Sequence, residues 1–216
     1  MKNIIVLIII FLLIGCSKRQ PINYKLLHKA EKMVNINADS ALAILTKISS
    51  PDELSTKDLA HWCMLSGKVT DKIYTSLPPT YLFEHAYKWY SSHGTIEDQV
   101  QMQLYLGRAY AEDGDYDSAM STYTEALEIA SDNHLDNAAG YISSYMGTLY
   151  EEKGMREQAI KKFKIAAIYF KNANNNKSYA CALRDIGREY ARTDSLSQAL
   201  AILHTADSIA INVNHK

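Results

Sequence analysis

The chain has 216 residues, and its 23 lysines and arginines nearly balance 24 aspartates and glutamates, which gives a net charge of −1. This balance excludes a strongly basic nucleic-acid-binding protein, so no nucleic-acid partner is expected. Hydrophobic residues make up 47% of the chain, enough for a packed core, and a total of only four prolines favours a fold made of helices.

The first 15 residues have the features of a signal peptide rather than of folded structure. Lys2 supplies a positive charge, and residues 4–14 form an unbroken apolar run. This run is too short for an ordinary membrane-spanning helix, which needs about 20 residues. It leads into Gly15 and Cys16, an ending that resembles the lipobox of bacterial lipoproteins and implies cleavage before Cys16 and acylation of that cysteine. The alternatives are an uncleaved anchor or a plain secretory signal.

Residues 16–21 are expected to form a short, polar, lipidated tether. The residue after Cys16 is Ser17, not the aspartate that signals retention in the inner membrane under the usual proteobacterial rule. The acidic run that signals surface export in some lipoprotein-rich bacteria is also absent from the sequence. We therefore expect a protein that is lipid-anchored in the cell envelope, at the outer membrane and facing the periplasm.

Residues 22–216 are expected to form one domain, which begins with two imperfect helical hairpins at about 22–49 and 53–93. In the first hairpin, apolar residues recur at helical spacing, at Leu26, Leu27, Ala30 and Met33. Between the hairpins, Ser50 and Glu53 have the spacing of a capping box and predict the start of a helix. In the second hairpin, the pair Pro78-Pro79 lies at the turn, where proline is tolerated.

From about residue 100 onward the sequence repeats with a period of forty residues, in blocks at about 100–133, 140–173 and 180–213. Four positions are identical in all three blocks: Gly107, Gly147 and Gly187; Tyr110, Tyr150 and Tyr190; Ala119, Ala159 and Ala199; and Ala126, Ala166 and Ala206. A fixed period of this length indicates stacked structural repeats. Each block contains two helical faces separated by a turn, at Gly114 in the first block.

This pattern resembles the tetratricopeptide repeat, whose sequence of large, small, aromatic, glycine, alanine, aromatic and alanine positions is matched by Leu106, Gly107, Tyr110, Gly114, Ala119, Tyr123 and Ala126. The usual repeat has 34 residues, so the extra residues here would lengthen the helices. The resemblance implies an all-α, right-handed superhelical solenoid of about five hairpins. Together with the lipobox, it makes the chain similar to Bacteroidetes-like tetratricopeptide lipoproteins.

Motifs for catalysis, cofactors and metals are absent from the sequence. It contains neither a Walker nor a dinucleotide-binding fingerprint, no nucleophile elbow and no pair of histidines at i, i+4 spacing. Cys63 and Cys181 lie on first helices three repeats apart, which should place them beyond the reach of a disulfide. We therefore expect no cofactor, no metal site and no enzymatic activity.

In this family the first helices line the inner groove, where ligands bind. Three tyrosines and four basic residues fall on first helices outside the predicted core. These seven are the candidate groove residues: Lys68, Tyr105, Arg108, Tyr141, Tyr145, Arg184 and Arg188. Tyrosine and arginine dominate binding hot spots. The alternative for the tyrosines is packing between long helices, and for the basic residues a solvated charged face. The asparagines with which some family members clamp a terminal carboxylate are absent.

The resemblance implies a non-enzymatic scaffold that binds an unidentified protein or peptide, and the groove residues suggest a partner that is extended and partly acidic or aromatic-accepting. Three alternatives remain open. The first is an adaptor for outer-membrane assembly or secretion, and the second is the truncated sensor part of a signalling regulator. The third is glycan binding, as in longer nutrient-uptake lipoproteins that contain these repeats.

Overall fold

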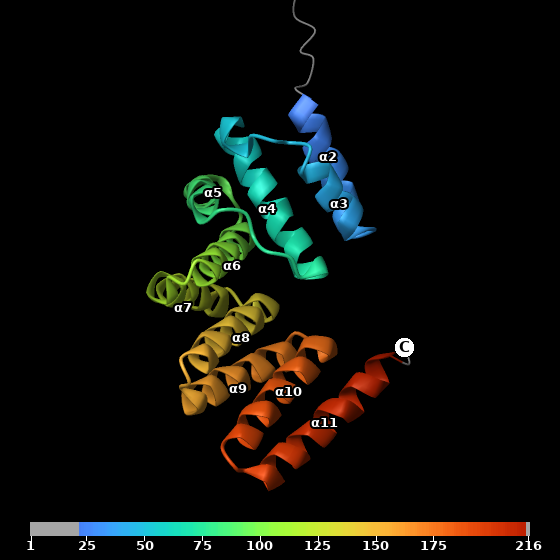
Figure 1. Cartoon of the computed structure of the whole chain (residues 1–216), viewed down its shortest axis with the longest axis vertical. Helices are drawn as coiled ribbons and strands as arrows, with labels where there is room; N and C mark the ends of the chain where they lie inside the picture. Colours follow the sequence, from blue (N-terminus) through green and yellow to red (C-terminus); the bar gives the residue numbers. More distant parts are fainter. Residues whose placement is uncertain (1–21, 215–216) are drawn as a thin grey trace, which may run out of the picture.

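The computed structural model describes residues 22–214. The predicted signal peptide, Cys16 and the tether lie outside these residues. Within them the chain forms ten α-helices and one short 3-10 helix and contains no strand. The prediction of an all-α repeat solenoid of about five hairpins is confirmed (Figure 1). Among the helices described, none is both long and apolar enough to span a membrane.

The helices pair as successive hairpins along the long axis of the molecule, from α2 at one end to α11 at the other (Figure 1). The pairs are α2 (Ile22–Val34) with α3 (Ala38–Leu45), α4 (Thr56–Ile73) with α5 (Thr80–His93), α6 (Ile96–Glu112) with α7 (Tyr116–Asp132), α8 (Asp136–Glu152) with α9 (Arg156–Asn172), and α10 (Asn176–Arg192) with α11 (Leu196–Asn214). Pro51–Glu53 form the 3-10 helix between the first two pairs.

A regular turn geometry explains the forty-residue period. Helices α6 to α10 each have 17 residues, and a three-residue turn follows each one. The middle residue of every such turn has a positive φ: Gly114, His134, Gly154, Asn174 and Asp194. The next residue donates its N–H to a carbonyl five residues earlier, as from Asp115 to Tyr110 at 2.9 Å. These are the features of a Schellman cap, and two such helix-and-turn units make one repeat.

Glycines on the first helices allow the second helices to pack closely. A Cβ atom at Gly107 would lie 2.4 Å from the ring of Tyr123, and one at Gly147 would lie 2.5 Å from the ring of Phe163. Both distances are shorter than any normal contact. The ring therefore occupies the space that a side chain at the glycine would need, which is the close packing predicted for this column.

The first two hairpins are less regular. A helix does begin after Ser50, but it is the 3-10 helix Pro51–Glu53, and the capping box predicted for Ser50 and Glu53 is wrong. The side chain of Ser50 makes no capping hydrogen bond, and Leu54 is extended, with ψ 157°, so the 3-10 helix cannot continue into α4. Helix α4 begins instead after Ser55, whose hydroxyl accepts a hydrogen bond from the N–H of Asp58 at 3.2 Å. Helix α5 follows α4 only after the longer link 74–79, which contains the two prolines.

Candidate functional site

Tyr105 is a core residue, so its assignment to the groove is wrong. Only 1% of it is exposed, and its ring covers Gly67, where a Cβ atom would lie 2.4 Å from Tyr105 Cδ2. In the later hairpins a side chain from the second helix of the same hairpin covers the corresponding glycine. In the α4–α5 hairpin, which has the longer link, the covering ring comes from the next hairpin instead.

Arg108 lies at the centre of a group of aromatic and acidic side chains. Its guanidinium carbon is 5.2 Å from the ring centroid of Tyr145 and 6.0 Å from that of Tyr105, distances that suit a cation–π interaction. It forms an ion pair with Asp71 and lies 3.9 Å from Glu112. The hydroxyl of Tyr105 donates to Asp71 at 2.9 Å. Arg108 is therefore held in place, and its charge is matched within the protein.

A pocket of about 230 Å³, the tyrosine pocket, opens beside Arg108. Its lining comes from α6, α7 and α8 and consists of Arg108, Ala111, Glu112, Tyr123, Tyr145, Thr148, Leu149 and Glu152. The rings of Tyr145 and Tyr123 are stacked, with centroids 6.0 Å apart. Burial raises the pKa of Tyr145 to about 12, so its hydroxyl stays protonated. The Tyr123 hydroxyl is buried and has no hydrogen-bond partner within the described part of the chain.

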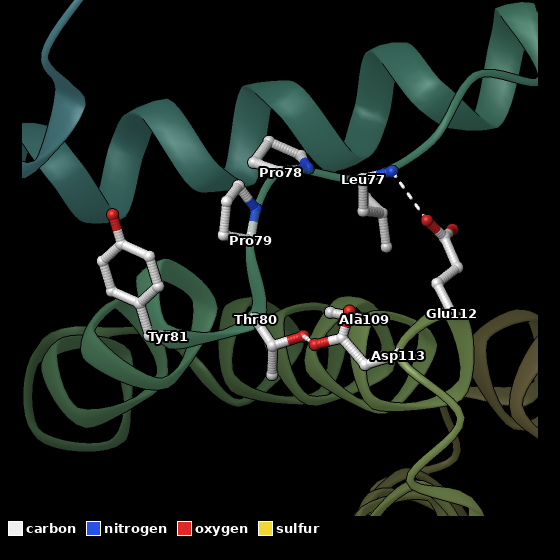
Figure 2. Close-up of a pocket in the computed structure, with 8 residues that line it drawn as sticks. All are labelled: Leu77, Pro78, Pro79, Thr80, Tyr81, Ala109, Glu112 and Asp113. Carbon is white, nitrogen blue, oxygen red and sulfur yellow. Dashed lines mark hydrogen bonds between the residues drawn. The ribbon is translucent and has the colours of Figure 1, made fainter.

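A larger pocket of about 490 Å³, the proline pocket, lies where the α4–α5 link passes the end of α6. It is lined by Leu77, Pro78, Pro79, Thr80, Tyr81, Ala109, Glu112 and Asp113. Figure 2 shows the prolines on one side of this space and the end of α6 on the other. The N–H of Leu77 donates to Glu112 at 2.8 Å, and the Thr80 hydroxyl donates to Asp113 at 2.6 Å (Figure 2). These two bonds fasten the link to α6.

Glu112 lines both pockets, so the pockets adjoin each other. Glu112 is the last residue of α6, at the end of the helix where the macrodipole is negative. Together the two linings contain three carboxylates, those of Glu112, Asp113 and Glu152, and one cationic side chain, that of Arg108. The sequence pattern predicted Arg108 and Tyr145 at this place. It gave no sign of the proline pocket, because Leu77 and Glu112 are 35 residues apart.

Tyr141 takes part in contacts between α8 and its neighbours rather than in either pocket. It is 38% exposed, and its ring packs edge-on against Phe170 with the centroids 5.0 Å apart. Its hydroxyl lies 3.0 Å from that of Ser178 on α10. For Tyr141, packing between long helices is therefore the better interpretation. Lys68 is exposed on α4 and belongs to the lining of neither pocket.

Arg184 and Arg188 belong to a set of ion pairs that we call the arginine network. Its members come from α8, α9 and α10 and are Glu151, Arg156, Arg184, Asp185, Arg188, Glu189 and Arg192. Arg188 lies 2.7 Å from Glu151 and 2.9 Å from Asp185. Burial raises the pKa of Glu151, but hydrogen bonds from Arg192 and Arg188 outweigh it and lower the pKa overall.

The centre of the arginine network is Glu189, a fully buried carboxylate that the sequence interpretation missed. Its side chain is 0% exposed and lies 2.6 Å from Arg192 and 3.3 Å from Arg156. The corresponding residues in the earlier repeats are Val69, Ala109 and Leu149. A glutamate in an otherwise apolar column was a signal in the sequence. Each charged side chain of the network pairs with an opposite charge, although Arg188 Nε is buried without a hydrogen-bond partner in the described residues. The network therefore resembles a structural clamp more than an open binding site.

Groups for redox or metal chemistry are sparse in the part of the chain that the structure describes. Cys63 is buried and Cys181 half-buried, and both are free thiols. Burial raises the pKa of the Cys63 thiol, which disfavours the reactive thiolate. Over the described residues no cluster of three or more histidine, cysteine, aspartate or glutamate side chains has a geometry that would hold a metal ion.

The fold and the two pockets define a helical repeat solenoid with binding space on its first helices. Residues 106–134 match the family model for the tetratricopeptide repeat. The match shows a tetratricopeptide repeat over these residues, and the other hairpins stack with it in the same all-helical architecture. A search of curated proteins finds no match.

Several solved structures share the fold. The chain is similar to the apo form of RapI, with a TM-score of 0.68 and 14% identity over 89% of this chain and 72% of that chain. It is also similar to BtubC from P. vanneervenii, with a TM-score of 0.63 and 15% identity over 90% of each chain. A putative kinesin light chain from Podosopora anserina gives 0.59 and 12%, over 89% of this chain and 97% of that chain. At these identities the similarity shows the fold alone.

Proposed function

We propose that this protein is a non-enzymatic scaffold, lipid-anchored at Cys16 in the bacterial cell envelope, that binds an extended segment of a protein partner across the proline and tyrosine pockets. The observation that carries the proposal is that Glu112 lines both pockets, of about 490 and 230 Å³, so that they lie on either side of one residue. The tetratricopeptide-repeat fold supports a role in protein–protein interaction.

The two pockets suit successive side chains of an extended peptide. The smaller one is below the roughly 300–1,000 Å³ of pockets that enclose drug-sized ligands, so it fits a single side chain. The larger one has Pro78, Pro79 and Tyr81 on its walls, and such preformed aromatic and proline surfaces bind with little loss of conformational entropy. Hydrogen bonds from the link to Glu112 and Asp113 keep the larger pocket in shape before a partner arrives.

Site-specific photo-crosslinking in living cells tests the binding surface. A crosslinking residue is placed at Thr148 in the tyrosine pocket and at Tyr81 in the proline pocket. Matched controls are Glu125 on α7 and Lys161 on α9, which are exposed and line neither pocket. We expect one shared partner to crosslink from Thr148 and Tyr81 and not from the controls. Crosslinks confined to Glu125 and Lys161 would move the working surface to the second helices and overturn the proposal.

A pocket-filling variant tests affinity once that partner is known. Thr148 is exposed, so Thr148→Trp should fill the tyrosine pocket while changing stability by less than about 0.5 kcal/mol. We expect binding to weaken at least tenfold, about 1.4 kcal/mol. Glu125→Trp serves as the control with the same added bulk. Equal affinity of the two variants would exclude the tyrosine pocket from the interface.

The lipid anchor has its own test, which does not depend on the pockets. Cys16→Ser removes the thiol that would be acylated. We expect loss of metabolic labelling by a fatty acid and release of the protein from the membrane fraction. Normal labelling of the variant would show that the lipobox interpretation is wrong.

A further inference from the structure

The hydroxyl of Tyr123 is not needed for packing in the repeat. The residues forty positions earlier and later are Phe83 and Phe163, and they are 0% and 1% exposed, as Tyr123 is at 0%. The Tyr123 ring covers Gly107 as the Phe163 ring covers Gly147. Since Phe163 fills this place equally well, the hydroxyl is the one chemical difference between Tyr123 and Phe163.

That hydroxyl is also costly to the folded protein without a ligand. It is buried in the wall of the tyrosine pocket and has no partner within residues 22–212. A buried polar group that loses its hydrogen bonds to water without replacing them destabilises the folded protein. A ligand group that enters the pocket and pairs with the Tyr123 hydroxyl removes this cost.

The charges around the pocket select what that group can be. Its lining contains two carboxylates, Glu112 and Glu152, and one guanidinium, that of Arg108, which is already paired with Asp71. Burial chiefly raises the pKa of Tyr123. The charge of Arg108 lowers it, and the charges of Glu112 and Glu152 raise it by smaller amounts, so both carboxylates act on the hydroxyl against the arginine. A positively charged donor would be attracted by both carboxylates, whereas an anion would be repelled.

The backbone adds to the same preference. Glu112 is the last residue of α6, and Glu152 is the last residue of α8. The C-terminal end of a helix carries a partial negative charge and favours cations within its last turn. Two such helix ends therefore flank the pocket together with their carboxylates.

We infer that the tyrosine pocket receives a lysine or arginine side chain of the partner, with its charged end between Glu112 and Glu152 and donating a hydrogen bond to the Tyr123 hydroxyl. The alkyl stem lies along Ala111, Leu149 and the ring of Tyr145, which form the apolar part of the lining. This inference rests on the proposed function, since it names the chemistry that the same surface recognises.

Three model peptides that differ in one side chain test the inference. They share the acetylated and amidated frame Gly-Ser-X-Ser-Gly, with lysine, norleucine or glutamate at X. Norleucine keeps the apolar stem of lysine and removes only the ammonium group. We expect the lysine peptide to shift the backbone NMR signals of Thr148 and Glu152 with saturation, and the other two to bind at least tenfold more weakly. Equal or stronger binding of the glutamate or norleucine peptide would overturn the inference.

Single substitutions test whether Glu152 and Tyr123 bind the lysine peptide. Glu152→Gln should weaken the lysine peptide at least threefold, and Glu125→Gln, which removes a carboxylate outside the pocket, should leave it unchanged. Tyr123→Phe should weaken the peptide by a similar factor while the thermal midpoint stays equal or rises, because an unpaired hydroxyl is removed. If Glu152→Gln and Tyr123→Phe both bind the lysine peptide as wild type does, the cation does not occupy this pocket.

The two proposals fail separately. If Thr148 and Tyr81 crosslink a partner but the lysine peptide shows no preference over norleucine, the scaffold function stands and the charge selection is wrong. If the lysine peptide binds as expected but crosslinks come only from Glu125 and Lys161, the pocket is a cation site and the interface with the partner lies elsewhere.

Discussion

Arg108 and Arg188 occupy the same repeat position eighty residues apart, yet their surroundings differ. Arg108 lies over the ring of Tyr145 beside an open pocket, and the residue after it is Ala109. Arg188 is held by carboxylates within the arginine network, and the residue after it is the buried Glu189. One arginine borders a space that a ligand can enter, and the other helps to bind three helices together.

The difference comes from the neighbours and not from the repeat position itself. Positions 105 and 145 carry tyrosine, whereas the corresponding Asp185 carries a carboxylate that pairs with Arg188. Both guanidiniums form ion pairs, Arg108 with Asp71 and Arg188 with Glu151 and Asp185, but only Arg108 also lies against tyrosine rings at the edge of a pocket. In a repeat protein, a column of identical residues therefore predicts shared packing better than it predicts a shared ligand site.

Among substitutions that test this difference between the two sites, the largest loss of stability is expected at Glu189. Glu189→Ala removes the buried carboxylate on which Arg156 and Arg192 converge. Removing one partner from a buried ion pair typically costs about 3–5 kcal/mol, and we expect about 3 because both arginines reach solvent. Urea unfolding measures the change, with Glu128→Ala on the exposed surface of α7 as the control. A loss below about 0.5 kcal/mol would show that the network is not a clamp.

A smaller difference in stability is expected between alanine substitutions at Gly107 and Gly187, the glycines just before Arg108 and Arg188. In Gly107→Ala the new Cβ would lie 2.4 Å from the rigid ring of Tyr123, and in Gly187→Ala 2.7 Å from the flexible side chain of Leu203. Overpacking costs about 1–3 kcal/mol, against a gain of about 1 from helix propensity. We expect Gly107→Ala to lose about 1–2 kcal/mol and Gly187→Ala to be nearly neutral. The reverse order in urea unfolding would contradict the packing described here.

The two sites should also respond to acid in opposite ways. The arginines lower the pKa of Glu151 below its ordinary value of 4.5, so its contribution to stability is present above pH 4.5 and is lost as the pH falls through the folded pKa. Burial holds the pKa of Asp71 above its ordinary 3.8 despite Arg108 and Tyr105. Its contribution is therefore greatest at low pH and declines as the pH rises through 3.8 and the folded pKa.

Thermal midpoints between pH 7 and pH 3 measure this opposition. The difference between wild type and Glu151→Gln should shrink as the pH falls below 4.5. The difference between wild type and Asp71→Asn should change in the other direction, because wild type gains from protonation of Asp71 and the variant cannot. Parallel profiles for the two variants would show that the carboxylates of the two sites are equivalent.

The smallest effect is expected at Arg184, the outermost member of the arginine network. Its side chain is 62% exposed and its Nε lies 3.7 Å from Asp185. Exposed ion pairs contribute about 0–1 kcal/mol, so Arg184→Ala should change the free energy of unfolding by less than about 0.5 kcal/mol. A loss comparable to that of Glu189→Ala would mean that the network depends on its rim as much as on its buried centre.

Much of the fold was predictable because its causes are local and recur. At Gly107, Gly147 and Gly187 a side chain of the following helix packs against the glycine and leaves no room for a Cβ atom. The forty-residue period repeats this contact in each block. The left-handed turns at Gly114 and Gly154 followed from glycine itself, and their φ values are 81° and 72°. Local chemistry of this kind depends only on residues that are close in sequence.

The binding surface was harder to predict because it depends on where the repeat is interrupted. Gly67 and Phe83 lie forty residues before Gly107 and Tyr123, so the period alone would pair them. In the structure Tyr105 covers Gly67 instead, in the hairpin that has the longer link 74–79. The same link creates the proline pocket by passing the end of α6 and bonding to Glu112. Contacts made across an irregular link have no periodic signature, so Arg108 and Tyr145 were found and the proline pocket was not.

The even spacing of the left-handed turns also sets how such a chain can change in length. Each turn centre follows the last by twenty residues, from Gly114 to Asp194. Deleting residues 136–175 would join the turn after α7 directly to α10 and leave every remaining turn in step. Deleting a single residue within a helix would rotate all that follows by about 100° and turn its apolar face away from its neighbour. Length variation that preserves the stack is therefore expected in whole hairpins. The deletion of 136–175 would keep the stack but remove α8 and with it Tyr145, Thr148, Leu149 and Glu152 from the lining of the tyrosine pocket.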